Sequence, residues 1–188
     1  MKGFWRTEGL FTTRRLAVMG MLAALTVVFG LFDIMVGPTS RVFSVRYLPG
    51  AVGAVLFGPV GGVMVAFVGD FAATLARGDG YLPGYALSAM AQSFLYALFL
   101  FRRPLTLPRA LLAQAAVFVV VVMGLGSLWQ ILYYGQAAGE ALALERIARN
   151  LALYPVHAWL VYSLGRETIR IDRKRAEGRD GGGVEIKN

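Results

Sequence analysis

Residues 56–62, which read Leu-Phe-Gly-Pro-Val-Gly-Gly, lie in the middle of an apolar stretch from Tyr47 to Ala76 whose single charged residue is Asp70. As one helix this stretch would be about 45 Å long, whereas the hydrocarbon core of a bilayer is about 30 Å thick. Proline removes a backbone donor and glycine favours turns. We therefore predict a break at Gly58–Pro59 and two shorter helices on either side of it.

The composition of the whole chain is that of a membrane protein. Charged residues make up 16% of the 188 residues and hydrophobic residues 57%, whereas soluble domains carry about 25% charged residues. So few charges cannot cover a globular surface, which excludes a soluble protein. Stretches without Lys, Arg, Asp or Glu are 16–32, 47–69, 80–101, 110–139 and 150–165. Most of them are long enough to span a membrane, which takes about 20 apolar residues, so we predict a polytopic protein.

The break in the central stretch predicts an all-α protein with six membrane-spanning helices. They are expected near residues 15–35, 43–57, 60–77, 83–101, 107–133 and 143–170. With six spans, 14 of the 19 basic residues fall on the side of the two termini, whereas five spans would leave 7 inside and 12 outside. Because cytoplasmic loops carry the excess of Lys and Arg, we predict six spans with cytoplasmic N and C termini.

This topology divides the chain into three parts. They are a cytoplasmic N-terminal segment, 1–14, a six-helix membrane domain, 15–171, and a cytoplasmic tail, 172–188, which is polar, glycine-rich and expected to be disordered from Ala176 onwards. In this topology the net charge of +8 reflects the orientation of the chain in the membrane. The basic residues of the chain are spread over three membrane-flanking segments, which argues against nucleic-acid binding.

Several kinds of chemistry are excluded by missing residues. The chain has no cysteine and one histidine, His157, so we predict no metal site and no cofactor. No G-x-x-x-x-G-K-[ST] motif occurs, so any ATP-driven work requires a partner subunit. We predict that the chain is not an enzyme. The alternatives are a membrane-embedded enzyme that uses His157 or Asp70 as a base, and a purely structural subunit.

Aromatic, glycine and basic residues gather at the outer ends of the predicted helices. Flat aromatic side chains beside guanidinium and amide groups suit a planar heteroaromatic ligand with an anionic end. Tyr and Trp at span ends are also typical of interfacial belts, but the glycines and the proline among them allow the backbone to approach a ligand. The residues of this outer cluster are Arg41, Ser44, Arg46, Tyr47, Gly78 to Ala89, Trp129, Tyr133, Tyr134, Arg146, Arg149 and Asn150.

Two further features lie within the predicted spans. Asp70 is an acidic residue at membrane depth, for which a functional role and an ion pair with a residue such as Arg77 are equally good explanations. Gly20 and Ala24 form a small-x-x-x-small pair on the first helix, and this spacing allows a second helix to approach closely.

The motifs together resemble the substrate-binding S components of energy-coupling factor (ECF) vitamin transporters, in particular the folate-specific branch. That branch carries a Leu-Pro pair, an L-F-G-P turn, a Gly-Asp pair and an F-P-G-F-T-L-S-A-like string in this order. Here the corresponding residues are 47–49, 56–62, 69–70 and 81–89, with further matches at 127–129, 132–135, 146–151 and Pro155. The string departs from the family in Tyr85-Ala86, where Phe-Thr is common.

The resemblance implies a non-enzymatic membrane protein that captures folate or a related pterin from outside, in the plasma membrane of a prokaryote. Its partners would be two cytoplasmic ATPase subunits and a transmembrane coupling subunit, which the Gly20–Ala24 motif would contact. An S component for another vitamin or for a queuosine precursor is the nearest alternative.

With the outer cluster, the resemblance yields a candidate binding site. Tyr81, Tyr85 and Trp129 would enclose the flat ring of the ligand. Ser88, Gln92 and Asn150 would supply hydrogen bonds. Arg46 or Arg149 would pair with a ligand carboxylate. The full candidate set is Arg46, Tyr47, Tyr81, Pro83, Gly84, Tyr85, Ser88, Gln92, Trp129, Arg149 and Asn150.

Overall fold

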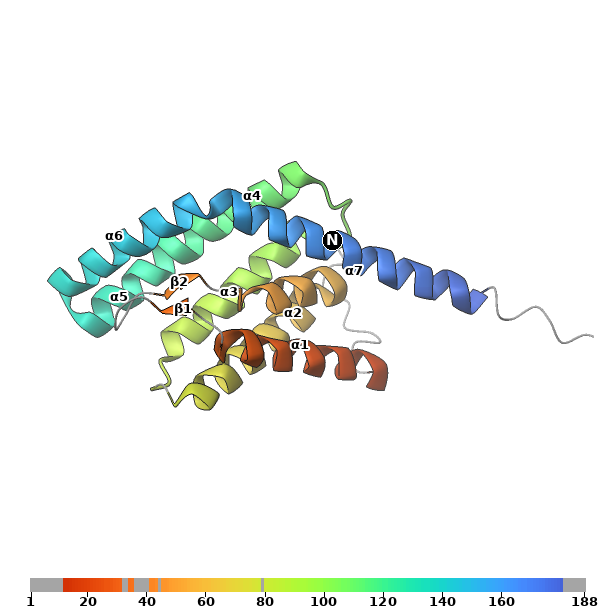
Figure 1. The fold of residues 1–188 in the computed structure, drawn as a ribbon, viewed down its shortest axis with the longest axis horizontal. Helices are drawn as coiled ribbons and strands as arrows, with labels where there is room; N and C mark the ends of the chain where they lie inside the picture. Colours follow the sequence, from red (N-terminus) through yellow and green to blue (C-terminus); the bar gives the residue numbers. More distant parts are fainter. Residues whose placement is uncertain (1–11, 32–33, 36–40, 44, 79, 181–188) are drawn as a thin grey trace, which may run out of the picture.

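The computed structural model describes residues 12–31, 34–35, 41–43, 45–78 and 80–180. In chain order its elements are α1 (Thr13–Leu31), β1 (Ile34–Met35), β2 (Arg41–Phe43), α2 (Leu48–Arg77), α3 (Pro83–Leu100), α4 (Leu107–Val117), the π-helical segment η1 (Phe118–Gly126), α5 (Ser127–Tyr134), α6 (Gln136–Ala152) and α7 (Tyr154–Asp180) (Figure 1). The predicted helical fold class is confirmed, with one addition. β1 and β2 form a short antiparallel hairpin.

The surface of the bundle is that of a membrane protein. Three of the described helical runs are long and apolar enough to cross a membrane, namely α1, α2 and the continuous run Leu107–Tyr134. Large apolar side chains are exposed on them, for example Met21 at 72% and Leu112 at 60%. Contiguous apolar surface of this kind is typical of membrane contact.

The predicted break in the central apolar stretch is confirmed at Gly58. This residue has φ 77° and ψ −166° inside α2, directly before Pro59. Glycine adopts positive φ at little cost, and proline cannot donate the next helical hydrogen bond. A Cβ at position 58 would also lie 2.8 Å from Cζ of Phe101. The chain therefore turns back on itself and α2 consists of two arms.

Small residues allow the two arms of α2 to pack against each other. A Cβ on Gly62 would lie 2.6 Å from the Cα atom of Ala54. One turn away, a Cβ on Gly53 would lie 3.3 Å from Cβ of Val65. The approach of the two arms brings residues near the start of α2 close to residues near its end.

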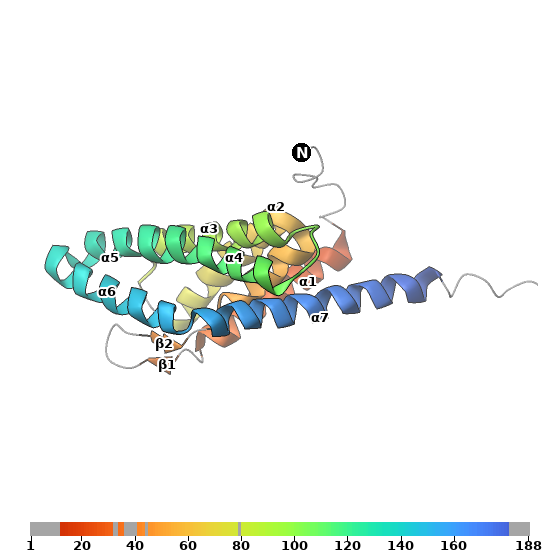
Figure 2. The ribbon, with the colours of Figure 1, turned by 90° about the horizontal axis from the view of Figure 1, so that it is seen from above.

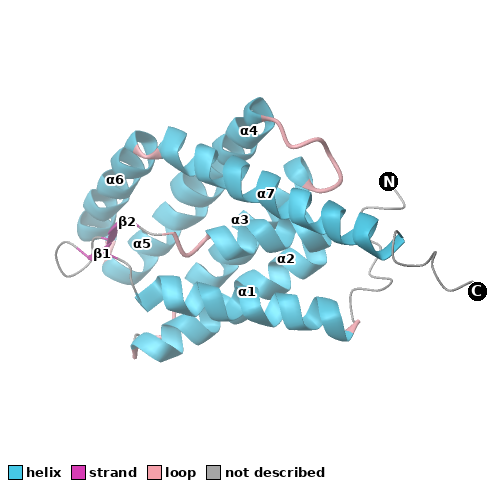
Figure 3. Cartoon of the chain, turned by 45° about the vertical axis from the view of Figure 1, so that its right-hand side comes forward, coloured by secondary structure: helices cyan, strands magenta, loops and turns pink. Residues whose placement is uncertain are grey.

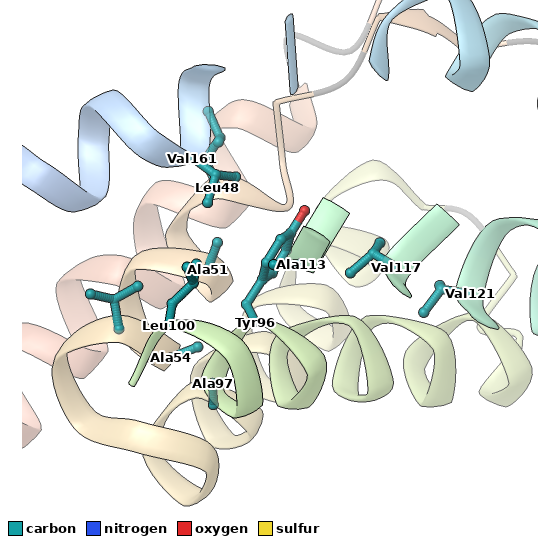
Figure 4. Close-up of a cluster of buried hydrophobic side chains, with 11 residues drawn as sticks. Leu48, Ala51, Ala54, Tyr96, Ala97, Leu100, Ala113, Val117, Val121 and Val161 are labelled. Carbon is teal, nitrogen blue, oxygen red and sulfur yellow. The ribbon is translucent and has the colours of Figure 1, made fainter. Parts of the chain in front are cut away.

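The core lies between α2, α3, α4, η1 and α7. Tyr96 on α3 is fully buried there, among the aliphatic side chains drawn in Figure 4. Its hydroxyl donates a hydrogen bond of 2.6 Å to Oε1 of Gln114. The Ser93 hydroxyl donates one of 3.0 Å to the Gly50 carbonyl. These bonds satisfy polar groups that would otherwise be buried unpaired.

Different elements lie at the two ends of the bundle. The β1–β2 hairpin lies at the same end as α5 and α6 (Figures 1 and 3). The described start of α1 and the end of α7 lie toward the opposite end, where α7 extends beyond the other helices (Figure 2). The starts of α2 and α3 also lie toward the hairpin end (Figures 1 and 3).

Three predicted boundaries are corrected. The last helix, predicted as 143–170, begins at Gln136 and is interrupted at Leu153 (φ −88°, ψ 0°), because Pro155 has no N–H to continue the helical hydrogen bonds. The second helix begins at Leu48 and not at 43, since residues 41–43 pair with β1. The described part of the first helix ends at Leu31.

The ends of the chain extend beyond what the structure describes. α7 continues to Asp180, into the segment predicted as a tail. Residues 1–11 and 181–188 lie outside the described residues, as does Ser44 of the outer cluster.

Candidate functional site

The first turn of α3 packs against α5 through aromatic rings. The indole of Trp129 lies directly on the backbone of Gly84, where a Cβ would stand 2.7 Å from Cε2 of the indole. The Gly84 N–H donates a hydrogen bond of 3.3 Å to the Tyr133 hydroxyl. The rings of Trp129 and Tyr133 are stacked at 6.1 Å, and Tyr85 lies 6.0 Å from Tyr133. The predicted residues Gly84, Tyr85 and Trp129 are thus brought together, with Tyr133 as a fourth member of this aromatic cluster.

The local sequence explains how α3 presents these residues. Pro83 occupies the first turn of the helix, where a missing N–H costs nothing. The buried Ser88 hydroxyl donates a hydrogen bond of 3.1 Å to the Gly84 carbonyl within the same helix. Gln92 is half-buried one turn further on. Tyr81 packs edge-on against Phe71 at the end of α2, with 5.1 Å between the ring centroids.

A second aromatic group surrounds Tyr47 at the start of α2. Its ring lies edge-on to His157 of α7 at 5.1 Å and is stacked on Tyr96 of α3 at 6.4 Å. His157 is 7% exposed. The only histidine of the chain therefore has a packing role between α2 and α7.

Several buried side-chain polar atoms lack a hydrogen-bond partner within the described part of the chain. Among them are the hydroxyl oxygen of Tyr47, Nε1 of Trp129 and Oε1 of Gln130. Buried polar side-chain atoms are nearly always hydrogen-bonded in folded proteins. Two of these atoms belong to α5, and Nε1 of Trp129 is part of the aromatic cluster, so a polar ligand at this helix would gain hydrogen bonds.

The candidate cation Arg46 is held in an ion pair. Its Nη2 lies 3.0 Å from Oδ1 of Asp70, whose side chain is 6% exposed. Arg77 donates a hydrogen bond of 3.4 Å to the Gly30 carbonyl. Asp70, on the second arm of α2, therefore pairs with Arg46, which precedes the first arm, and not with Arg77, the partner considered from the sequence.

The polar candidates on α6 make contacts within their own helix. Arg149 Nη1 lies 3.3 Å from Oε1 of Glu145. The Asn150 amide donates a hydrogen bond of 2.8 Å to the Arg146 carbonyl. Over the residues that the structure describes, no group of three or more His, Cys, Asp or Glu side chains could hold a metal ion.

The small-residue motif on α1 lies on an open face. A Cβ on Gly20 would meet no described heavy atom within 4 Å, and Ala24 is exposed. The bundle leaves this face of α1 accessible to another helix.

Two residues outside the candidate set join the site. Tyr133 contacts both Gly84 and Trp129, as described above. The guanidinium of Arg146 lies against Gly126, where a Cβ would stand 2.7 Å from Nη1. Helical spacing carried a signal for both, because Tyr133 follows Trp129 by four residues and Arg146 precedes Asn150 by four.

The fold is that of a helical membrane protein, and its candidate site consists of aromatic and arginine side chains. Residues 14–165 match the family of ECF transporter substrate-specific components, and the chain belongs to this family. The family predicted from the sequence motifs is therefore confirmed, and its members are transporter components rather than enzymes.

Named relatives and a solved structure agree with this assignment. The folate transporter FolT of Clostridium novyi (strain NT) is 25% identical over 155 residues, which cover 82% of this chain and 89% of that protein. The folate transporter FolT of Leuconostoc mesenteroides subsp. mesenteroides is 26% identical over 158 residues, which cover 81% and 84%. A crystal structure of FolT bound with folic acid has a TM-score of 0.75 and 28% identity, and the match covers 83% of this chain and 95% of that one.

Proposed function

We propose that this protein is the S component of an ECF transporter that captures folate or a related pterin from outside for ATP-driven uptake. The observation that carries the proposal is the aromatic cluster of Gly84, Tyr85, Trp129 and Tyr133, with buried unsatisfied polar atoms beside it. A pterin is a flat heteroaromatic ring with hydrogen-bonding edges, which suits such a site. The likeness to FolT bound with folic acid supports the same ligand class.

The proposed roles of the candidate residues follow from their places. Tyr81, Tyr85 and Trp129 enclose the ring, and Tyr47 lines the α2 side. Ser88 and Asn150 already bond within their own helices, so the ligand uses the acceptor capacity that these side chains retain. Gln92 supplies a further hydrogen bond one turn beyond Ser88.

The proposed topology has six spans and cytoplasmic termini. The spans are α1, the two arms of α2, α3, the run from α4 to α5, and the run from α6 to α7, within the domain boundaries 1–14, 15–171 and 172–188. The break at Gly58, the common end of α1's start and α7's end, and the distribution of Lys and Arg support it. The site then faces the outside of a prokaryotic plasma membrane.

The proposed partners are a transmembrane coupling subunit and two cytoplasmic ATPases. The chain itself carries no P-loop motif, so ATP hydrolysis must occur on other subunits. The open face of α1 at Gly20 and Ala24 is the proposed contact with the coupling subunit, since small residues allow close helix packing in membranes.

Binding of labelled folate to the purified full-length protein in detergent tests the ligand. We expect saturable binding that unlabelled folate displaces and that riboflavin, thiamine and biotin do not. A chain that binds one of these vitamins or a queuosine precursor, and not folate, would contradict the ligand assignment. Absence of any small-molecule binding would favour a structural subunit.

A further inference from the structure

Three arginines lie near the candidate site, and two of them already have a carboxylate partner. Arg46 pairs with Asp70 at 3.0 Å, and Arg149 pairs with Glu145 at 3.3 Å. The third, Arg146, makes no side-chain hydrogen bond or ion pair with the described residues. On Arg46 or Arg149 a ligand carboxylate would share the guanidinium with an acidic side chain, whereas on Arg146 it would not.

Arg146 lies close to the aromatic cluster, so a ligand bound to the cluster would be near its side chain. Its side chain is half-buried on α6 and lies on Gly126, at the junction of η1 and α5. A Cβ at position 126 would stand 2.7 Å from Nη1 and 2.8 Å from Cζ, so the missing side chain makes room for the guanidinium. Tyr85 of the aromatic cluster is an electrostatic neighbour of Arg146.

A half-buried guanidinium without an acidic partner favours the binding of an anion. Removing a charge from water without a partner is costly, and a second arginine of the same sign, Arg149, lies one turn away on α6. Arginine binds carboxylates through two parallel N–H···O bonds, which are the strongest hydrogen bonds that it makes.

Independent atoms on α5 point to the same ligand. Nε1 of Trp129 and Oε1 of Gln130 are buried without a hydrogen-bond partner among the described residues, three and four positions after Gly126. One unsatisfied donor and one unsatisfied acceptor thus lie on α5 within about one turn of Gly126, the residue against which the guanidinium packs.

We propose that Arg146 receives the anionic end of the substrate and thereby selects folates, which carry a glutamate, over neutral pterins. The proposal rests on the proposed function and names a specificity-determining residue of that site. In this proposal Arg146, and not Arg46 or Arg149, is the partner of the ligand carboxylate.

The test compares Arg146→Gln with the control Arg170→Gln, which changes an exposed arginine on α7 (65% exposed) outside the candidate site. Affinities of the purified full-length variants are measured for folic acid and for 6-hydroxymethylpterin, which has no carboxylate. We expect Arg146→Gln to weaken folic acid about 10- to 100-fold, the loss typical of a charged hydrogen bond, and to change the pterin affinity less than about threefold. Arg170→Gln should change both affinities less than about threefold. Arg146→Lys should restore part of the folic acid affinity, since it keeps the charge and loses the fork.

The outcomes separate this inference from the proposed function. If the wild-type protein binds no folate, the proposed function fails. If the wild type binds folate and Arg146→Gln binds it equally well, the Arg146 assignment is wrong and the function stands. Equal losses for folic acid and the pterin would also overturn the assignment. Should Arg146→Gln not fold, as judged by gel filtration, Arg146→Lys serves as the test variant, and a folic acid affinity unchanged relative to the pterin affinity overturns the proposal.

Discussion

Arg46, which precedes α2, and Asp70, on the second arm of α2, form an ion pair of 3.0 Å. The pair links two parts of the chain. One is the segment between the hairpin and α2, and the other is the second arm of α2. The Asp70 side chain is 6% exposed and that of Arg46 22%, so both charges are largely removed from solvent. Asp70 therefore has a structural partner in Arg46, two residues before the start of α2.

Asp70→Asn is expected to destabilise the protein, because it leaves the Arg46 guanidinium buried without its carboxylate. Breaking such a pair costs about 3 kcal/mol. Thermal unfolding in detergent measures the effect. The matched control is Glu167→Gln, which breaks the exposed pair with Arg170 (3.7 Å, side chains 60% and 65% exposed). It should leave the transition nearly unchanged; similar shifts for both variants would contradict the structural role of Asp70.

Gly62→Ala is expected to separate the two arms of α2. The new Cβ would stand 2.6 Å from the Cα atom of Ala54, and backbone cannot move aside as a side chain can. Overpacking of this kind costs about 2 kcal/mol. The control is Gly124→Ala, whose Cβ would meet its nearest atom at 3.5 Å. Equal thermal stability of the two variants would argue against a tight turn at Gly58–Pro59.

Gly84→Ala is expected to displace the Trp129 indole and to weaken folate binding more than tenfold. The methyl group would stand 2.7 Å from Cε2 of the indole, and the indole is itself stacked on Tyr133. Gly80→Ala lies four residues earlier, meets no described atom within 4 Å and should bind like the wild type. If Gly84→Ala keeps the wild-type affinity, the aromatic cluster is not part of the folate-binding site.

Gly20→Trp is expected to block assembly and not ligand binding. The bulky ring would fill the open face of α1, which a closely packed partner helix needs. Folate binding by the isolated variant should equal that of the wild type, whereas ATP-dependent uptake in cells that supply the partner subunits should be lost. Leu75→Trp, at a position that is 60% exposed, is the control and should support uptake. Full uptake by Gly20→Trp would place the partner elsewhere.

Features set by local chemistry could be predicted from the sequence. The break at Gly58–Pro59 needs only a residue that tolerates positive φ and one that cannot donate a hydrogen bond. The string that opens α3 places Gly84, Tyr85 and Ser88 within two turns of one helix, so their proximity follows from spacing alone. The expected boundaries 83–101 and 107–133 agree with the observed helices within a residue.

Features set by tertiary approach could not be predicted. The Arg46–Asp70 pair depends on how tightly the arms of α2 close, which the spacing of the two residues does not fix. The contact between the Arg146 guanidinium and Gly126 depends on the packing of α6 against α5. Pro155 was visible in the sequence, but whether a proline ends a membrane helix or is accommodated within it depends on its neighbours.

Equilibrium titration of folic acid into the purified full-length protein, followed by tryptophan fluorescence, examines the ligand and its site together. The wild type should saturate at one folate per chain. Trp129→Ala should bind about 10- to 100-fold more weakly, the loss typical of a stacked aromatic ring. Trp159→Ala, which removes an indole that is 59% exposed on α7, should bind like the wild type. Absence of saturable folate binding to the wild type, or equal affinities of the two tryptophan variants, would contradict a folate site built around Trp129.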